Sequence, residues 1–198
     1  MESKKIKIRI EFTEEVLGGA SANADIHSEF IASKAPDAAS MTEEIEAIGL
    51  DEVERKAVTV FPRDADGTPM LWDYQLKGFF KDVCGFLRRV PGTEASKLKA
   101  YKKILDGLLF VHGRRIRLHP AGDMSICQRP LRAQTMQGER VALASSECLP
   151  TGTWLECEVE VLEPSLEKFV REALDYGQLL GIGQWRNSGK GRFIWTEI

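Results

Sequence analysis

The alternation at the start of the chain limits the fold more than any other feature of the sequence. Residues 4–12, KKIKIRIEF, place Ile6, Ile8 and Ile10 on one side of an extended backbone and cations on the other. This pattern is typical of a half-buried strand. The rest of the chain must therefore supply a cover for one face of the sheet.

Two helical patterns are suited to this cover. Residues 74–90 carry one apolar stripe at helical spacing, made of Leu76, Phe79, Phe80, Val83, Phe86 and Leu87. A second helix is expected to begin near Ser165, which follows Pro164 and precedes Glu167 in the first turn.

Further strand patterns complete the order of elements. They occur in AVTVFPRDADGTPML, LLFVHGRRIRLHP and GTWLECEVEVLE. The order predicts an α+β fold with a ferredoxin-like, RRM-like β-α-β-β-α-β core, one face of which stays open to bind single-stranded nucleic acid. We expect one domain over residues 1–198, with an acidic insertion at about 24–56 and a long loop at about 121–147.

Composition excludes several classes of protein. With 198 residues and 43% hydrophobic content, the chain can bury one sizeable core. No apolar run reaches the length of a membrane span, and charges occupy the place of a signal peptide, so we expect a cytoplasmic protein without a membrane partner. The cysteines Cys84, Cys127, Cys148 and Cys157 form no C-x-x-C pair, so we expect buried thiols, no metal and no cofactor.

Charge is distributed unevenly along the chain. The net charge is −3, yet residues 76–147 hold 14 Lys and Arg against 6 Asp and Glu. This basic block is suited to a phosphate-binding face, and a solvated basic face without a ligand is the alternative.

A glycine-rich segment near the C-terminus combines bare backbone with positive charge. Glycine permits positive φ and a close approach of another backbone, while cations favour an anion such as phosphate. The glycines are Gly181, Gly183, Gly189 and Gly191, and the cations are Arg186, Lys190 and Arg192. Trp185 stands between them, and its two possible roles, stacking on a base or anchoring the loop, stay open.

Four segments resemble the RAMP superfamily, the repeat-associated proteins that build CRISPR effector complexes and process their guide RNA. LLGIGQWRNSGKGRF is similar to the C-terminal glycine-rich motif of that family, and Leu76, Lys77 and Gly78 match its Leu-Lys-Gly step into the first helix. VLGGASA and CLPTGTWLECEVEV resemble its first glycine loop and the strand entry before its second helix. The resemblance implies a backbone-type subunit that binds guide RNA.

The chain departs from the family pattern at two places. Asp73, Tyr74 and Gln75 stand where the family often has Gly-Ser-Ser, which removes the basis for any contact made there. Some RNA-cutting backbone subunits carry an Asp ahead of the first helix, but Asp25 has no neighbouring acid to share that work. Target cleavage is therefore not implied by the resemblance.

The basic block divides into a strand and the long loop. Strand alternation in GRRIRLHP places Arg115, Arg117 and His119 on one face, either for phosphates or to protect an edge strand. The loop mixes apolar residues with polar ones suited to gripping RNA, among them Arg129, Arg132, Gln134 and Arg140. In RAMP backbone subunits a hairpin at this place, the thumb, does that work; the alternative is a loop folded onto the core.

Three functional hypotheses follow. The first is a non-catalytic subunit that polymerises head to tail along guide RNA, with its complementary target strand, copies of itself and other effector subunits as partners. In it, the four glycines near the C-terminus admit the ribose-phosphate chain, and four cations neutralise it: Lys77, Arg186, Lys190 and Arg192. The second is a metal-independent endoribonuclease with His27 as general base and Lys77 or Lys34 as phosphorane stabiliser, against which stands a surface histidine without a role. The third is a phage-borne mimic or inhibitor of such a complex.

Overall fold

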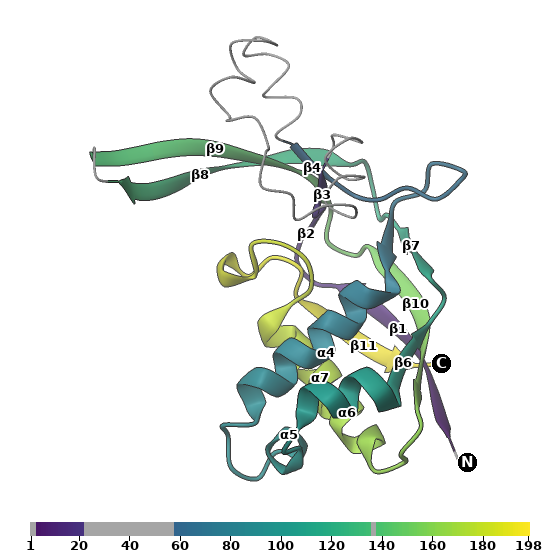
Figure 1. The fold of residues 1–198 in the computed structure, drawn as a ribbon. Helices are drawn as coiled ribbons and strands as arrows, with labels where there is room; N and C mark the ends of the chain where they lie inside the picture. Colours follow the sequence, from purple (N-terminus) through teal and green to yellow (C-terminus); the bar gives the residue numbers. More distant parts are fainter. Residues whose placement is uncertain (1–2, 22–57, 136–137) are drawn as a thin grey trace, which may run out of the picture. The chain divides into compact units, whose positions relative to one another are not determined.

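The computed structural model describes residues 3–21, 58–135 and 138–198 (Figure 1). It divides into two compact units, which we call the helix unit and the hairpin unit. The helix unit contains Met1–Val16, Pro62–Met124 and Leu149–Ile198, and the hairpin unit contains Leu17–Phe61 and Ser125–Cys148.

Some sequence-based expectations are left untested. The acidic insertion expected at about 24–56 lies outside the described residues, as does His27. The single domain expected over 1–198 stays a prediction.

The helix unit is built on a six-stranded antiparallel sheet. Its strands are β1 (Lys4–Phe12), β5 (Met70–Trp72), β6 (Leu109–His112), β7 (Arg115–His119), β10 (Trp154–Val161) and β11 (Phe193–Glu197). The order is β11-β1-β10-β7-β5, and β6 pairs with β10 beside β7. Strand β1 thus lies between β10 and β11, as the first strand does in a ferredoxin-like sheet. The predicted α+β ferredoxin-like core is confirmed.

The helices cover one face of this sheet, as Figure 1 shows for α4 and α7. They are α4 (Asp73–Leu87), α5 (Glu94–Lys97), α6 (Tyr101–Leu108), α7 (Leu166–Leu180) and the 3-10 turn η1 (Arg186–Ser188). The helices predicted at 74–90 and from near Ser165 are therefore present, although α4 ends at Leu87 and Phe86 is 54% exposed. Ser165 precedes α7, but its hydroxyl donates a hydrogen bond to the Glu163 carboxylate instead of capping the helix.

The core lies between the sheet and these helices. Ile6, Ile8 and Ile10 of β1 are at most 1% exposed beneath them, as the alternation predicts. Phe193 of β11 connects the sheet to helix α4. Its ring packs edge to face against Phe12 of β1 and Phe79 of α4, at centroid distances of 6.3 and 5.4 Å. Edge-to-face rings add specific attraction to the burial of apolar area.

Two helix glycines differ in the room around them, and this difference predicts opposite stability effects. A Cβ at Gly78 of α4 meets nothing within 4 Å, whereas one at Gly177 of α7 would lie 2.1 Å from the Phe193 ring. Gly78→Ala should raise the free energy of unfolding by about 0.5–1 kcal/mol through helix propensity. Gly177→Ala should lower the free energy of unfolding by about 1–2 kcal/mol, because overpacking against the Phe193 ring costs more than the gain in helix propensity. Urea denaturation of both variants checks this, and equal effects would contradict the packing at Phe193.

The hairpin unit is organised around a second, five-stranded sheet. Its strands are β2 (Val16–Leu17), β3 (Ala20–Ser21), β4 (Val58–Val60), β8 (Ser125–Thr135) and β9 (Gly138–Leu149). Gly18 shows why glycine follows β2: a Cβ there would lie 2.4 Å from the Val60 carbonyl carbon, and its N–H donates to the Glu147 carbonyl at 2.9 Å. The first glycine loop therefore serves a close approach of backbones within this unit.

Strands β8 and β9 form a long antiparallel hairpin, with register partners from Ser125 and Cys148 to Thr135 and Gly138. The long, thumb-like loop expected at about 121–147 contains these two strands, and whether it acts as a thumb stays a prediction. In the sequence of the hairpin, apolar residues do not alternate regularly with polar ones, and Ile126 and Leu143 are 54% and 59% exposed. Pro130 within β8 also argues against a strand when the sequence is considered alone, because proline cannot donate a hydrogen bond to a neighbouring strand.

None of the four cysteines, which all lie within the described residues, is in a disulfide. Cys84 and Cys148 are buried, and Cys127 and Cys157 are half-buried. Burial raises the pKa of the Cys84 thiol to about 11 and that of the Cys157 thiol to about 12. Both therefore stay protonated and unreactive near neutral pH.

Candidate nucleic-acid interface

The glycine-rich segment forms a turn that connects α7 to β11 in the helix unit. Four glycines in it adopt positive φ, with values of 75° at Gly181, 91° at Gly183, 86° at Gly189 and 71° at Gly191. Trp185 is the one non-glycine residue with positive φ, at 56°, among the residues that the structure describes. We call residues 181–192 the glycine turn.

The glycine turn closes on its own backbone. Ile182 N–H donates to the Gly191 carbonyl at 2.9 Å, and a Cβ at Gly191 would lie 1.8 Å from the Ile182 carbonyl oxygen. A Cβ at Gly181 would lie 2.6 Å from the Lys190 carbonyl oxygen. The sequence analysis assigned the space beside these glycines to RNA backbone, but at Gly181 and Gly191 the chain itself occupies it.

Two cations of the glycine turn already pair with acids of the helix unit. Arg186 donates to Asp82 of α4 at 2.9 Å, and Lys190 donates to Glu15. The N–H of Gly191 also donates to the Glu15 carbonyl, at 2.8 Å. These acids, far away in sequence, were missed by the sequence analysis, and no local pattern could have revealed them.

Arg192 differs from these two cations. Within the described residues it forms no ion pair, and its buried Nε donates no hydrogen bond. Its guanidinium lies beside Gly189, where a Cβ would be 3.5 Å from the Arg192 Cζ. A buried guanidinium donor without an acceptor is costly, so an anion that accepts from it gains free energy.

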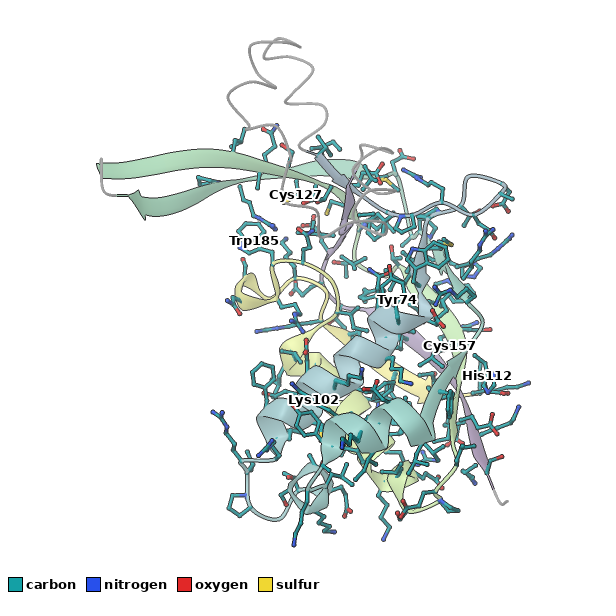
Figure 2. All side chains as sticks on the ribbon, viewed as in Figure 1. Tyr74, Lys102, His112, Cys127, Cys157 and Trp185 are labelled. Carbon is teal, nitrogen blue, oxygen red and sulfur yellow. The ribbon has the colours of Figure 1, made fainter. Side chains whose placement is uncertain are left out.

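Trp185 stands on the outside of the glycine turn, where Figure 2 labels it. It is 36% exposed, and its αL backbone is uncommon for a bulky residue.

The cations predicted on β7 are where the alternation places them. Arg115, Arg117 and His119 are exposed, while Ile116 and Leu118 are buried. Both arginines, however, reach the carboxylate of Asp64, at 3.2 Å from Arg115 and 2.7 Å from Arg117. The Ala65 N–H and the Arg117 guanidinium hold the pKa of Asp64 below its usual value.

The open face of the sheet carries charges of both signs. Glu156, Glu158 and Glu160 of β10 pair with Arg9, Lys5 and His112 respectively. Trp154 is covered on the same face, since Arg9 lies 4.2 Å above its ring and His119 stacks on it at 3.8 Å. An RNA strand on this face would meet three carboxylates, so the glycine turn is the more suitable anion site.

Lys77 lies away from the glycine turn, against α6. Its Nζ donates to the Asp106 carbonyl at 2.8 Å and lies 4.9 Å from the centre of the Phe110 ring. Desolvation lowers the pKa of Lys77. The structure therefore does not bring Lys77 together with the cations of the turn.

The remaining predicted residues lie on the β8–β9 hairpin. Arg129 is half-buried on β8, and its register partner is Ala144. The register pairs Arg132 with Val141, Gln134 with Glu139, and Arg140 with Ala133. All four thus belong to one hairpin of the hairpin unit.

The described residues offer neither a cluster of metal ligands nor a helix suited to crossing a membrane. No group of three or more His, Cys, Asp or Glu is placed there to hold a metal ion. None of the described helices is both long and apolar enough to cross a membrane.

Solved structures reveal what this arrangement resembles. A chain in the cryo-EM structure of type III-B Cmr-beta bound to cognate target RNA superposes with a TM-score of 0.53 at 10% identity, over 100% of this chain and 59% of that chain. The chain has a RAMP-like fold. Cmr6 from Pyrococcus furiosus matches with a TM-score of 0.49 at 10% identity, over 98% of this chain and 99% of that one. No family model and no curated sequence matches.

The RAMP-like fold agrees with the resemblance seen in the four sequence segments. At 10% identity the likeness concerns the fold alone. The chain also spans 59% of the Cmr-beta chain that it matches.

Proposed function

We propose that the chain is a non-catalytic RNA-binding subunit of a CRISPR effector complex that contacts the backbone of the guide RNA. The observation that carries the proposal is the likeness of the whole chain to part of a protein whose structure holds target RNA. The family resemblance of the glycine turn supports the same function.

Charge at the glycine turn supports phosphate as the recognised group. Arg192 has a guanidinium without an acid partner among the described residues, and Arg186 and Lys190 precede it in the same turn. A phosphate would add an acceptor for Arg192 and compete with Asp82 and Glu15 for the other two cations. Contacts of this kind read the backbone and not the bases.

The proposed partners follow from the same function. They are the guide RNA, its complementary target strand, further copies of this chain arranged head to tail, and other effector subunits, in the cytoplasm. A RAMP-like fold with cations on both a turn and a hairpin suits a subunit that contacts RNA along an extended path.

Purification from cells that carry a CRISPR array tests the proposal. The tagged protein should bring down guide RNA of defined sequence and migrate as a large, nuclease-sensitive assembly. Protein free of RNA, or RNA without guide sequence, would contradict it. Recovery of effector subunits without RNA would instead indicate an inhibitor of the complex.

His27→Ala tests the proposed lack of catalysis. We expect the wild-type protein to leave a repeat RNA intact in the presence of chelator, so the variant has no cleavage to lose and should bind RNA as tightly as the wild type. Gel analysis of labelled repeat RNA provides the measurement. Site-specific cutting by the wild type that His27→Ala abolishes would establish a metal-independent endoribonuclease with a histidine base.

A further inference from the structure

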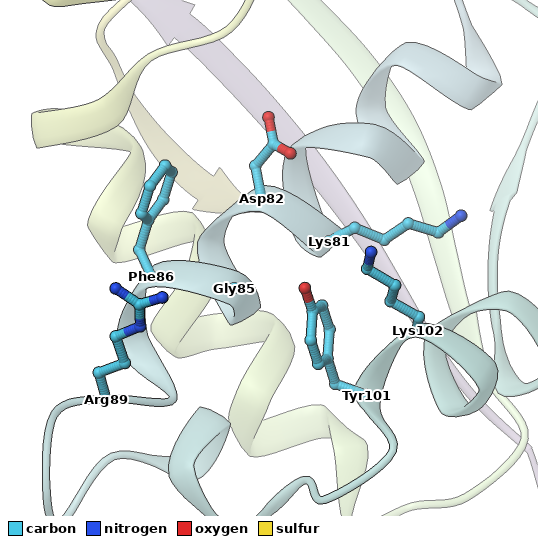
Figure 3. A pocket seen from close by; sticks show the side chains of 7 residues that line it. All are labelled: Lys81, Asp82, Gly85, Phe86, Arg89, Tyr101 and Lys102. Carbon is cyan, nitrogen blue, oxygen red and sulfur yellow. The ribbon is translucent and has the colours of Figure 1, made fainter.

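A pocket of about 390 Å³ opens between α4 and α6 in the helix unit (Figure 3). None of the residues proposed to bind the guide lines it, although its residue Asp82 pairs with Arg186 of the glycine turn. Gly85 and Phe86 of α4 and Arg89, just after that helix, line one side. Tyr101 and Lys102, the first two residues of α6, line the other. The volume falls in the range of small-molecule sites.

The pocket holds more positive charge than its own acids balance. Two of its lining residues are already paired, since Lys81 meets Asp106 and Asp82 meets Arg186. Arg89 and Lys102 form no ion pair within the part of the chain that the structure describes. Two cations on opposite walls favour an anion between them.

The first turn of α6 adds to this charge. Its N-cap residue, Ala100, offers no side-chain cap to the first N–H groups of the helix. Those groups, next to Tyr101 and Lys102, carry positive partial charge that an anion can satisfy. Helix end and side chains therefore favour the same kind of ligand.

An exposed aromatic ring gives the pocket an apolar wall. Phe86 is 54% exposed, although its neighbours Val83 and Cys84 are fully buried. Figure 3 shows Phe86 and Arg89 on one side of Gly85 and Tyr101 on the other. A Cβ at Gly85 would lie 3.2 Å from the Tyr101 hydroxyl, so glycine keeps this space clear. The site thus offers a ring for stacking beside cations for phosphate.

We infer that this pocket binds a nucleoside 5′-phosphate, with the phosphate between Arg89 and Lys102 and the base against Phe86. The source of that group is either a free nucleotide or the 5′-phosphorylated end of a single strand. The inference goes beyond the proposed function, because a mononucleotide can occupy the pocket whether or not a longer strand binds at the glycine turn.

Titration calorimetry with adenosine monophosphate at low ionic strength tests the inference. The wild type should bind it, and Arg89→Ala and Lys102→Ala should each weaken binding about tenfold, because each removes a charge-assisted hydrogen bond. Phe86→Ala should weaken it about tenfold by loss of stacking, while binding of inorganic phosphate stays unchanged.

Lys103→Ala is the matched control, since it removes an exposed cation one residue from Lys102 but outside the pocket lining. It should bind the nucleotide like the wild type. Equal losses in Lys103→Ala and Lys102→Ala would overturn the inference, as would adenosine monophosphate binding no tighter than inorganic phosphate.

Short RNAs with and without a 5′-phosphate identify the source. If the pocket holds a strand end, the phosphorylated RNA should bind more tightly, and Arg89→Ala should remove that advantage. If the pocket holds a free nucleotide, the two RNAs should bind with equal affinity, while Arg89→Ala still weakens binding of adenosine monophosphate. If the guide-binding proposal fails, adenosine monophosphate should still bind the pocket. The guide-binding proposal and the nucleotide inference are therefore tested separately.

Discussion

Replacing Arg186, Lys190 and Arg192 together by Ala should weaken binding of single-stranded RNA about a hundredfold at low salt. Each lost phosphate contact removes a charge-assisted interaction, and the salt slope should fall by about 0.7 for each contact in a single strand. The loss should be the same for RNAs of different sequence, because the contacts are to the backbone. A salt titration by fluorescence anisotropy measures both quantities.

A second triple variant, Lys97→Ala, Lys99→Ala and Lys103→Ala, is the matched control. It removes the same charge from exposed positions on and around α5 and α6. It should change RNA affinity only slightly. If the two triple variants bind RNA equally, the glycine turn is a structural closure and the phosphate site lies elsewhere.

The three cations of the turn should contribute unequally. Arg186 and Lys190 must leave Asp82 and Glu15 to serve a phosphate, which offsets part of their gain. Arg192 has no acid partner among the described residues, so it breaks no ion pair there when it binds a phosphate. Arg192→Ala alone should therefore weaken binding about tenfold, and each of the other two by about threefold.

Gly191→Ala should lower the free energy of unfolding by about 3 kcal/mol or more. The new Cβ would lie 1.8 Å from the Ile182 carbonyl oxygen, and the backbone at φ 71° is strained for any L side chain. Both effects act on the folded protein without RNA. Thermal and urea unfolding give the measurement.

Gly189→Ala is the control for this variant, because it shares the positive φ, 86°, but meets only an ordinary contact at 3.5 Å. It should cost about 1 kcal/mol, the strain of the backbone alone. If Gly191→Ala is as stable as Gly189→Ala yet loses RNA affinity, the space beside Gly191 belongs to RNA after all.

The fold was predictable because it depends on periodicity within single elements. Ile6, Ile8 and Ile10 fall on one buried face, and Arg115 and Arg117 on one exposed face, as alternation requires. The prediction ran α4 to residue 90, whereas the helix ends at Leu87. Phe86 belongs to the predicted apolar stripe, yet its ring is 54% exposed and lines a pocket. No sequence-based expectation covered α5 and α6, although Thr93 caps α5 by accepting from the Ser96 N–H at 3.1 Å.

The site was predictable in its residue types but not in its pairing. The glycine turn was found as a cluster of glycines and cations, whereas its acids, Asp82 and Glu15, lie more than a hundred residues away in sequence. At residues 125–149 periodicity did not reveal the strands, because apolar and polar residues do not alternate there, and the hairpin was expected only as one alternative from the family resemblance. Such pairings depend on the folded chain, which periodicity does not describe.

The position of β1 between β10 and β11 has a consequence for how the protein is made on the ribosome. Both strands that neighbour β1 lie in residues 154–197, which are synthesised long after β1. Until then the apolar face of Ile6, Ile8 and Ile10 has no sheet to join, and contacts of such long sequence separation form slowly. The nascent chain therefore carries an exposed, aggregation-prone strand until residues 154–197 have emerged, and its yield should depend on chaperones that shield this strand.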